Sequence, residues 1–407
     1  MAVTKPVVVV GASMAGLRVA EALRRFGYTG PITAIGDEPH APYNRPPLSK
    51  EVLAGDEVSH ATVAFPQRAA TADVGWVLGN RAESADLLHQ TVTAADGSVF
   101  EYSTLIAATG LRPKRQTYPN NLMAGRHVIR TLDDAIGLRA ALGPGVRVVV
   151  LGAGFVGCET AATARKLGAD VTIVAPGAVP IGRILGSELA SEIQRRQEAE
   201  GVQFRMKRTV TDLIGESKIE GVLLDDGSEL PCDVFIEAIG SHCNTEWLSD
   251  NDIDITDGVL TDSNLRAVKT SGGVWDNVFA IGDVAKFPNE LFDGLARRVE
   301  HWNIPTESGK HVGQLVALQH TNTPEAAAQL SELMSKKFQP VPSFWSDQFD
   351  THLLAFGLLA LADEHKLVQG ELSGDCVFEY YRSGKLVGAA GIGMRSVVQG
   401  YRNAFTA

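Results

Sequence analysis

Residues 7–25 combine a strand, a turn of small residues and a helix, an arrangement that can hold a phosphate group. The four valines at 7–10 predict a strand buried on both faces, and the apolar residues after the turn recur at helical spacing. Gly11, Ser13 and Gly16 form the turn, where bare N–H groups and the positive end of the helix dipole would face a pyrophosphate. Serine replaces the middle glycine of the dinucleotide-binding fingerprint, so this turn alone leaves an ordinary strand–helix connection as an alternative.

The same arrangement occurs again in the middle of the chain, this time with all three glycines. Gly152, Gly154 and Gly157 follow the run RVVVL at 147–151. Each turn also has its own later strand that ends in small residues, LIAATG for the first and DVFIEAIG for the second. Such a duplication of a whole unit is far more specific than one motif. It predicts an α/β fold with two Rossmann-like dinucleotide-binding domains and a C-terminal α+β domain.

The two units differ in the residues that follow their second strands. Asp37 and Glu38 stand where an acid holds a ribose hydroxyl, although an acidic turn after a strand is the alternative. In the second unit the corresponding strand ends in Ala175 without an acid, and Arg183 lies a few residues further on. The sequence therefore favours NADH only through the absence of an immediate arginine, and NADPH stays open.

Three further charged residues stand where they could contact a cofactor. The loop at 41–55 contains two adjacent prolines with Arg45 and Lys50 on either side, and such cations are useful close to a pyrophosphate. Asp283 follows a strand and could accept hydrogen bonds from a polyol chain. A solvated surface loop and a helix cap are the respective alternatives.

Composition narrows the class of protein. The 37 basic and 48 acidic residues give a net charge of −11, which argues against a nucleic-acid partner. The chain enters a strand almost at once, and its apolar run at 353–362 is too short to span a bilayer, so we expect a cytoplasmic protein without a membrane partner.

The cysteines exclude several kinds of chemistry. All four are scattered, which excludes the usual ligand spacing of zinc and iron–sulfur sites and a disulfide framework, so we expect no metal site. Dithiol chemistry would need a cysteine within 43–50, and none is present there. The four are Cys158, Cys232, Cys243 and Cys376.

The order of the motifs predicts the domain boundaries. We expect a discontinuous FAD-binding domain at 1–113 and 242–320, an NAD(P)H-binding domain at 114–241, and a C-terminal domain at 321–407. The C-terminal domain carries no recognisable catalytic constellation.

The motifs follow one another in an order that resembles a flavoprotein family. GASMAG, GDEPHAPYNRPPLSK, LIAATGLRP, GAGFVGCE, NVFAIGDVA, EHWN and FWSDQ extend over essentially the whole chain. This order is similar to that of FAD-dependent ferredoxin reductases of the putidaredoxin reductase and aromatic-ring dioxygenase type, in the pyridine nucleotide-disulfide oxidoreductase superfamily. The resemblance implies an enzyme that passes electrons from NADH via FAD to a small iron–sulfur ferredoxin, which serves a Rieske-type dioxygenase or a haem monooxygenase. A rubredoxin reductase and an apoptosis-inducing-factor-like interaction protein are the alternatives.

The resemblance also implies which residues bind the cofactors FAD and NADH. They are Gly11, Ser13, Met14, Ala15, Gly16, Asp37, Glu38, Arg45, Pro46, Lys50, Arg81, Ala82, Ala108, Thr109, Gly110, Arg130, Gly152, Gly154, Phe155, Val156, Gly157, Glu159, Arg183, Ile239, Gly240, Gly282, Asp283, Glu300, His301, Trp302 and Trp345.

Three of these residues are the implied catalytic residues. Lys50 would stabilise negative charge on the reduced flavin ring, and Glu159 would lie close to the nicotinamide amide. Trp302 would stack on the flavin ring or shield it, with an ordinary buried tryptophan as the alternative. Asn44 departs from the family, where an Asp or Gln is more usual.

The resemblance implies a monomer or a homodimer that docks an acidic ferredoxin. A local basic patch is expected for that purpose despite the negative net charge. Arg297 and Arg298, just before EHWN, are the candidates, and a plain solvated helix face is the alternative.

Overall fold

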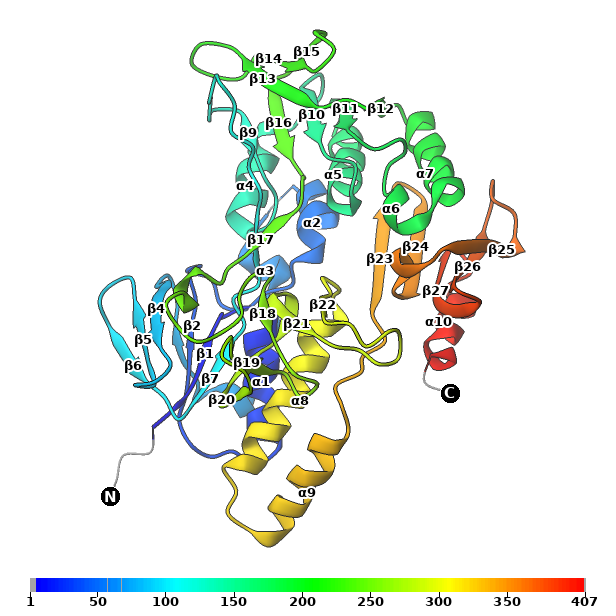
Figure 1. The fold of residues 1–407 in the computed structure, drawn as a ribbon. Coiled ribbons are helices and arrows are strands. Elements are labelled where there is room, and N and C mark those ends of the chain that lie inside the picture. The colour runs from blue at the N-terminus through cyan, green and yellow to red at the C-terminus, as the bar shows by residue number, and fades with distance from the viewer. Residues whose placement is uncertain (1–4, 57, 67, 406–407) are drawn as a thin grey trace. The chain divides into compact units, whose positions relative to one another are not determined.

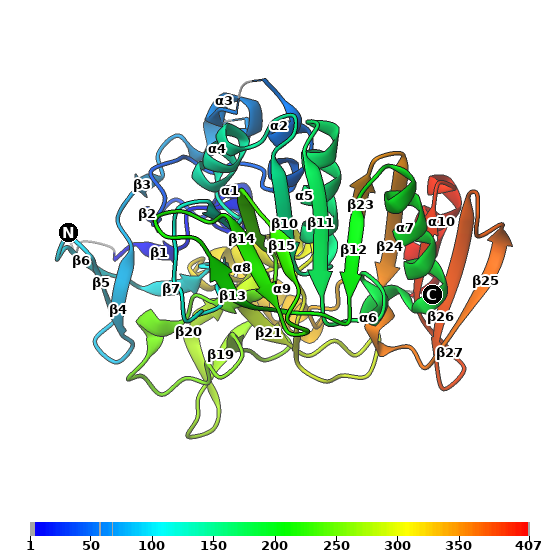
Figure 2. The same ribbon diagram turned by 90° about the horizontal axis from the view of Figure 1, so that it is seen from above.

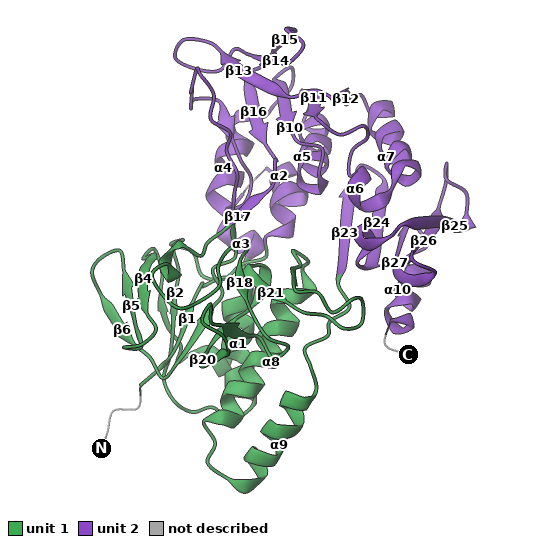
Figure 3. Cartoon of the chain, viewed as in Figure 1, with its two compact units in different colours: residues 1–44, 64–111, 243–342 green, residues 45–63, 112–242, 343–407 purple. Residues whose placement is uncertain are grey.

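The computed structural model describes residues 5–56, 58–66 and 68–405, and Figure 1 labels its elements. The chain forms two compact units, which Figure 3 distinguishes by colour. The first unit contains residues 1–44, 64–111 and 243–342, and the second contains residues 45–63, 112–242 and 343–407. Each unit is therefore assembled from three separate segments of the chain.

A six-stranded sheet forms the centre of the first unit. Its order is β19 (Arg266–Val268), β20 (Val274–Ala280), β7 (Thr104–Ala107), β1 (Val7–Val10), β2 (Ile32–Ile35) and β3 (Gly75–Val77). β1 pairs in parallel with β2 and β7, and all four of its valines are buried, as the sequence predicted. β19 alone among these six strands pairs antiparallel with its neighbour.

Helices α1 (Met14–Arg25) and α8 (Asn303–Gln319) pack against each other in the first unit. A Cβ atom at Gly313 would lie 2.5 Å from the Cβ of Ala22, and one at Gly309 would lie 3.0 Å from the backbone nitrogen of Val19. Glycine at these two positions therefore lets the helices approach closely. The next helix, α9 (Pro324–Ser335), has its proline in the first turn.

Smaller elements complete the first unit. The stretch 79–105 forms three strands before it enters β7, and a turn at Asp96-Gly97 joins two of them. The elements are β4 (Ala82–Asp86), β5 (Thr91–Ala94), β6 (Val99–Glu101), β18 (Val259–Leu260), β21 (Ala285–Phe287), β22 (Arg297–Arg298), η2 (Ala69–Thr71), η3 (Glu246–Leu248) and η4 (Gly282–Val284).

A five-stranded parallel sheet forms the larger part of the second unit. Its order is β12 (Gln203–Met206), β11 (Asp170–Ala175), β10 (Arg147–Leu151), β16 (Val234–Glu237) and β9 (Arg126–His127). β10, β11 and β12 lie side by side in Figures 1 and 2. The helices of this part are α4 (Leu132–Ala141), α5 (Phe155–Lys166), α6 (Gly182–Leu185) and α7 (Ser187–Ala199), and a small sheet contains β13 (Val210–Ile214), β14 (Gly221–Leu224) and β15 (Glu229–Pro231).

An antiparallel sheet forms the C-terminal part of the second unit. Its order is β23 (Ser343–Gln348), β24 (Thr351–Gly357), β27 (Lys385–Ile392), β26 (Cys376–Arg382) and β25 (Glu364–Gly370), and α10 (Arg395–Ala404) follows it. The remaining short elements of the unit are η1 (Pro46–Ser49), α2 (Glu51–Ala54), α3 (His60–Val63) and η5 (Leu359–Leu361). Two of the boundaries between the units, at 111/112 and 242/243, fall within two other short strands, β8 (Leu111–Pro113) and β17 (Ser241–Cys243).

The two parallel sheets and the C-terminal antiparallel sheet confirm the predicted fold class. In each parallel sheet a strand, a glycine turn and a helix lead to a neighbouring parallel strand, as β1–α1–β2 and as β10–α5–β11. None of the helices in the described ranges is long and apolar enough to cross a bilayer.

Candidate active site

The first glycine turn owes its shape to two glycines. Gly11 has a φ of +125°, and a Cβ atom there would lie 2.1 Å from the carbonyl oxygen of Ala108. A Cβ atom at Gly16 would lie equally close, 2.1 Å, to the carbonyl oxygen of Gly11. Ser13, by contrast, is the N-cap of α1 with a φ of −114°, which any residue can adopt. Serine at the middle position therefore introduces no backbone strain.

The second turn repeats this geometry. Gly152 has a φ of +111°, and its Cβ would lie 2.2 Å from the carbonyl oxygen of Ala238, while a Cβ at Gly157 would lie 2.1 Å from the carbonyl oxygen of Gly152. Gly154 is the N-cap of α5, and a Cβ there would meet no protein atom within 4 Å. The N-terminus of this 12-residue helix thus faces open space, which is what a nucleotide pyrophosphate requires.

Backbone hydrogen bonds connect the acidic turn of the first unit to other predicted residues. The N–H of Asn80 donates to the carbonyl of Gly36 at 2.9 Å, and that of Gly79 donates to the carbonyl of Glu38 at the same distance. Arg81 comes next and Ala82 begins β4, so both lie beside the turn that carries the exposed Asp37.

Strand ends bring two further predicted segments to the first glycine turn. Ala108 contacts Gly11 as described, and Thr109 Oγ1 donates to the carbonyl of Asn244 at 2.6 Å. A Cβ at Gly282 would lie 3.2 Å from the Cβ of Ala15, which places the start of η4, with Asp283, next to α1. The structure therefore gathers residues 11–16, 108–110 and 282–283 at one edge of the six-stranded sheet.

Trp302 stands at the start of α8 as its N-cap and is 38% exposed, so it is not a core residue. Its indole Nε1 donates to Asn44 Oδ1 at 3.1 Å, which gives Asn44 the role of orienting the ring. The neighbouring His301 is half-buried, and the removal of its ring from water lowers its pKa to about 4, so it is neutral near pH 7. Glu300, the third predicted residue of this segment, accepts a hydrogen bond from Arg298.

In the second unit the structure brings Lys50 and Glu159 together. Lys50 Nζ lies 3.2 Å from Glu159 Oε1 and 3.3 Å from Asp347 Oδ2, and it is 5.5 Å from the centre of the Trp345 ring. The side chains of Lys50 and Glu159 are only 10% and 7% exposed. This ion pair is therefore largely removed from solvent. Electrostatic interactions are stronger in such surroundings than in water.

Two hydroxyl groups complete the surroundings of the Glu159 carboxylate. Ser49 Oγ donates to Oε2 at 2.8 Å, and Ser346 Oγ donates to Oε1 at 2.7 Å. Burial raises the pKa of Glu159, and Lys50 and the two serines act in the opposite direction. These donors stabilise a carboxylate that would otherwise be costly to bury.

The amide side chains of two buried glutamines form a hydrogen-bonded chain that ends at Ser346. Gln348 Nε2 donates to Ser346 Oγ at 3.0 Å, and Gln197 Nε2 donates to Gln348 Oε1 at 2.5 Å. Because the serine oxygen accepts from Gln348, its own hydrogen is directed to Glu159. The Ser346–Gln348–Gln197 chain thus fixes the direction of the hydrogen bond to the carboxylate.

The C-terminal region, in which the sequence showed no recognisable catalytic constellation, contributes side chains to the surroundings of Lys50 and Glu159. Strand β23 supplies Trp345, Ser346 and Asp347 to the surroundings of Lys50 and Glu159. The sequence shows the alternation of the polar residues Ser346 and Gln348, whereas only the structure shows that both are buried. Buried polar side chains need partners.

The remaining predicted residues of the second unit are distributed over several of its elements. Arg45 Nη1 donates to the carbonyl of Arg130 at 2.8 Å, and Phe155 packs against Phe344 with ring centres 4.8 Å apart. The other predicted residues are Pro46, the first residue of η1, the exposed Val156 and Arg183, and Ile239 and Gly240 just after β16.

The two docking candidates of the first unit are neutralised by acids. Arg297 forms an ion pair with Asp293, and Arg298 forms ion pairs with Asp257 and Glu300. An acidic protein that docked here would have to compete with these three carboxylates for the two guanidinium groups.

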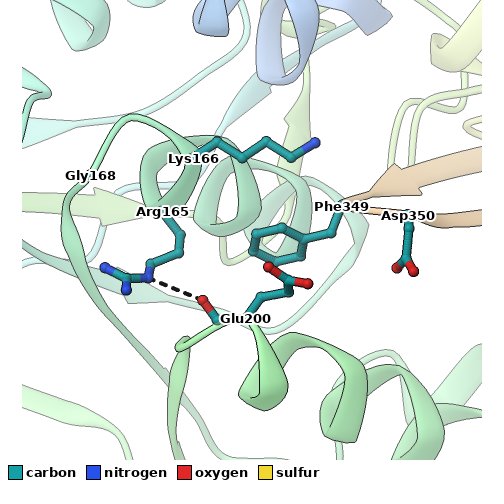
Figure 4. Close-up of a pocket in the computed structure, with 6 residues that line it drawn as sticks. All are labelled: Arg165, Lys166, Gly168, Glu200, Phe349 and Asp350. Atoms are coloured by element: carbon teal, nitrogen blue, oxygen red, sulfur yellow. Dashed lines mark hydrogen bonds between the residues drawn. The ribbon is translucent and has the colours of Figure 1, made fainter.

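Two cavities open on the second unit. The one in Figure 4 has a volume of about 500 Å³, and no predicted site residue lines it. Its walls are Arg165, Lys166, Gly168, Glu200, Phe349 and Asp350. The other, of about 570 Å³, is lined by Lys50 and Asp347 among others, so it gives access to the Lys50–Glu159 pair.

Comparison with known proteins agrees with this geometry. Residues 5–309 match the pyridine nucleotide-disulphide oxidoreductase family, and residues 343–407 match the reductase C-terminal family. A biphenyl dioxygenase system ferredoxin–NAD(+) reductase component of Paraburkholderia xenovorans (strain LB400) is 32% identical over 335 residues, which are 82% of this chain and 80% of that protein. A rubredoxin–NAD(+) reductase of Pseudomonas putida is 31% identical over 366 residues, 89% of this chain and 88% of that protein.

A solved structure resembles the whole chain. The crystal structure of the ferredoxin reductase for the CYP199A2 system from Rhodopseudomonas palustris superposes with a TM-score of 0.87 at 30% identity, and it covers 98% of this chain and 94% of its own. The resemblance stated from the motifs is therefore confirmed, and the chain belongs to the pyridine nucleotide-disulphide oxidoreductase family.

Proposed function

We propose that this protein passes electrons from NADH, through FAD, to a small iron–sulfur ferredoxin that serves an oxygenase. The observation that carries the proposal is the pair of glycine turns with the same backbone geometry in one chain. The family confirms the predicted cofactors, FAD and NADH, and relatives similar over most of the chain are ferredoxin–NAD(+) reductase components. The proposed domain boundaries remain those predicted from the motifs.

The residues of each turn fit one nucleotide. In the first unit, Gly11, Ser13 and Gly16 would hold the FAD pyrophosphate, and Asp37 or Glu38 the ribose hydroxyls. In the second unit, the space beside Gly154 would take the NADH pyrophosphate. When bound, FAD supplies the chemistry, because a flavin accepts a hydride from NADH and releases the electrons singly.

The buried pair of the second unit supplies electrostatic control. Lys50 would stabilise negative charge that develops on a reduced ring, because its ammonium is shielded from water. Glu159 would accept a hydrogen bond from the nicotinamide amide, with its orientation held by Ser49 and Ser346. Both roles are proposals about positioning and charge, and neither needs a side-chain nucleophile.

Thiol chemistry is not part of the proposal. The four cysteines are free thiols, and burial raises the pKa of Cys158 to about 12, so this thiol stays protonated and unreactive. Free thiols also fit the cytoplasm, where we place the protein.

An anaerobic titration tests the proposed function. Purified protein should show a flavin absorption spectrum that is bleached by one equivalent of NADH, and the reduced protein should then reduce a ferredoxin. Colourless protein, or bleaching without transfer to any small iron–sulfur protein, would refute the proposal. Rubredoxin is the second candidate acceptor because one similar relative is a rubredoxin–NAD(+) reductase, and it belongs in the same assay.

A further inference from the structure

The turn after β11 lacks side chains that could hold a ribose hydroxyl. β11 ends at Ala175, and Pro176, Gly177 and Ala178 follow it in exposed positions. In dinucleotide-binding domains an acid at this place binds the ribose 2′-hydroxyl and repels a 2′-phosphate. Here nothing in the turn performs either task.

The neighbouring strand brings cations to the same turn. β12 pairs in parallel with β11, and Figure 2 shows the two strands side by side. Just beyond β12, the N–H of Lys207 donates to the carbonyl of Gly177 at 3.0 Å, and the N–H of Arg208 donates to the carbonyl of Ala175 at 3.1 Å. Backbone hydrogen bonds thus hold two consecutive basic residues next to the turn that lacks the acid.

The backbone also connects Arg183 to this region. The N–H of Ile181 donates to the carbonyl of Ala153 at 2.8 Å, so the segment after the turn runs back to the second glycine turn. Arg183 follows in α6 and is exposed. Arg183 therefore lies just after the segment that connects the end of β11 with the second glycine turn.

Only part of this positive charge is neutralised. Arg208 Nε donates to Asp226 Oδ2 at 2.6 Å, and Asp225 Oδ1 accepts from the backbone N–H of Thr209. Within the described part of the chain, the side chains of Lys207 and Arg183 make no ion pair. Both side chains are exposed and remain available to an anionic ligand.

From this arrangement we infer that the second nucleotide site has a 2′-phosphate subsite, formed by Lys207 and Arg183 beside Ala175, and that it accepts NADPH as well as NADH. The inference rests on the proposed function, because it assigns the second glycine turn to the nicotinamide nucleotide. A phosphate dianion would gain charge-assisted hydrogen bonds there without meeting a carboxylate of the turn.

Flavin reduction by both nucleotides is the first test. We expect kcat/KM for NADPH within about tenfold of that for NADH, because no acid discriminates between them. A preference for NADH above tenfold would overturn the inference. If neither nucleotide reduces the flavin, the proposed function fails, and the binding measurement below still decides about the subsite.

Calorimetry of the flavin-loaded protein with adenosine 2′,5′-diphosphate and 5′-AMP isolates the subsite from the redox reaction. The two probes differ only in the 2′-phosphate, and the diphosphate should bind about tenfold more tightly. Equal affinities would refute the subsite.

The double variant K207A/R183A should remove this preference and lower kcat/KM for NADPH at least fivefold more than that for NADH. Lys218→Ala, which removes an exposed lysine from the same unit, is the matched control and should preserve both ratios. Ala175→Glu should restore a preference for NADH, with far-UV circular dichroism as the check on its folding. Equal losses with both nucleotides in the double variant would mean that these cations do not contact the 2′-phosphate.

Discussion

The two glycine turns use the same backbone geometry and differ where the nucleotide would lie. In both, the first glycine has a positive φ and the third glycine packs against the first, and a side chain at either place would collide with the backbone. The middle residue is Ser13 in one turn and Gly154 in the other, with ordinary φ values of −114° and −80°. The comparison teaches that folding dictates the first and third positions, whereas the ligand dictates the middle one.

A side chain at the middle position of the second turn should have the largest effect of the changes that distinguish the two turns. Gly154→Val adds a side chain where no protein atom lies within 4 Å, so the fold should tolerate it. The added group occupies the pyrophosphate space, and we expect kcat/KM for NADH to fall by about 100-fold or more with FAD retained. Stopped-flow flavin reduction measures this change.

The matching change in the first turn is Ser13→Val. It should lower the FAD content of the purified protein instead, which absorbance reports. Loss of the flavin from the Gly154→Val protein would mean that the two turns are assigned the wrong way round.

Glu159→Gln should have the next largest effect, because it removes the negative charge of the buried carboxylate in the second unit. We expect kcat/KM for NADH to fall about 10- to 100-fold, the value of a hydrogen bond to a charged group. Burial raises the pKa of Glu159, so the wild-type rate should decline with falling pH at a pH above the usual glutamate range. The glutamine variant should lack this acidic decline, and a decline identical to that of the wild type would exclude Glu159 as its source.

Ser346→Ala should have a smaller effect with a distinctive pH dependence. Removing the hydroxyl that donates to Glu159 Oε1 raises the pKa of the carboxyl further. The acidic decline of flavin reduction should therefore move to higher pH, with a loss of only a few-fold at neutral pH.

Ser396→Ala, on the exposed face of α10, is the control for Ser346→Ala. A purely structural role for Ser346 would lower the amount of folded protein and leave the pH profile in place.

The smallest effect is expected from making the two turns alike. Ser13→Gly should change the free energy of unfolding by only a few tenths of a kcal/mol and the FAD dissociation constant by less than about threefold. The reason is that the φ at Ser13 is already accessible to serine. Urea denaturation and flavin fluorescence measure the two quantities, and a larger loss of affinity would show that the serine hydroxyl binds the cofactor.

The sequence predicted the parts of the site that depend on neighbouring residues. Both glycine turns and the acids after β2 could be predicted because each belongs to a local pattern of strand, turn and helix. The glycine packing of α8 on α1 is a long-range consequence that only the structure shows.

The surroundings of Glu159 could not be predicted in this way. Ser49, Glu159 and Ser346 come from three distant segments, and no local periodicity relates them. Only the tertiary packing of β23 beside α5 brings them together, because each side chain satisfies another buried polar group.

The central sheet of the first unit has a consequence for how the protein is made. β7 pairs on one side with β20, which the ribosome delivers only after the whole of residues 112–242. At about 5–20 residues per second, the hydrogen-bonding edge of β7 stays open for on the order of ten seconds during synthesis. An open edge of apolar residues such as Leu105 and Ile106 invites pairing with other nascent chains, so expression at low temperature or with chaperones should raise the yield of native protein.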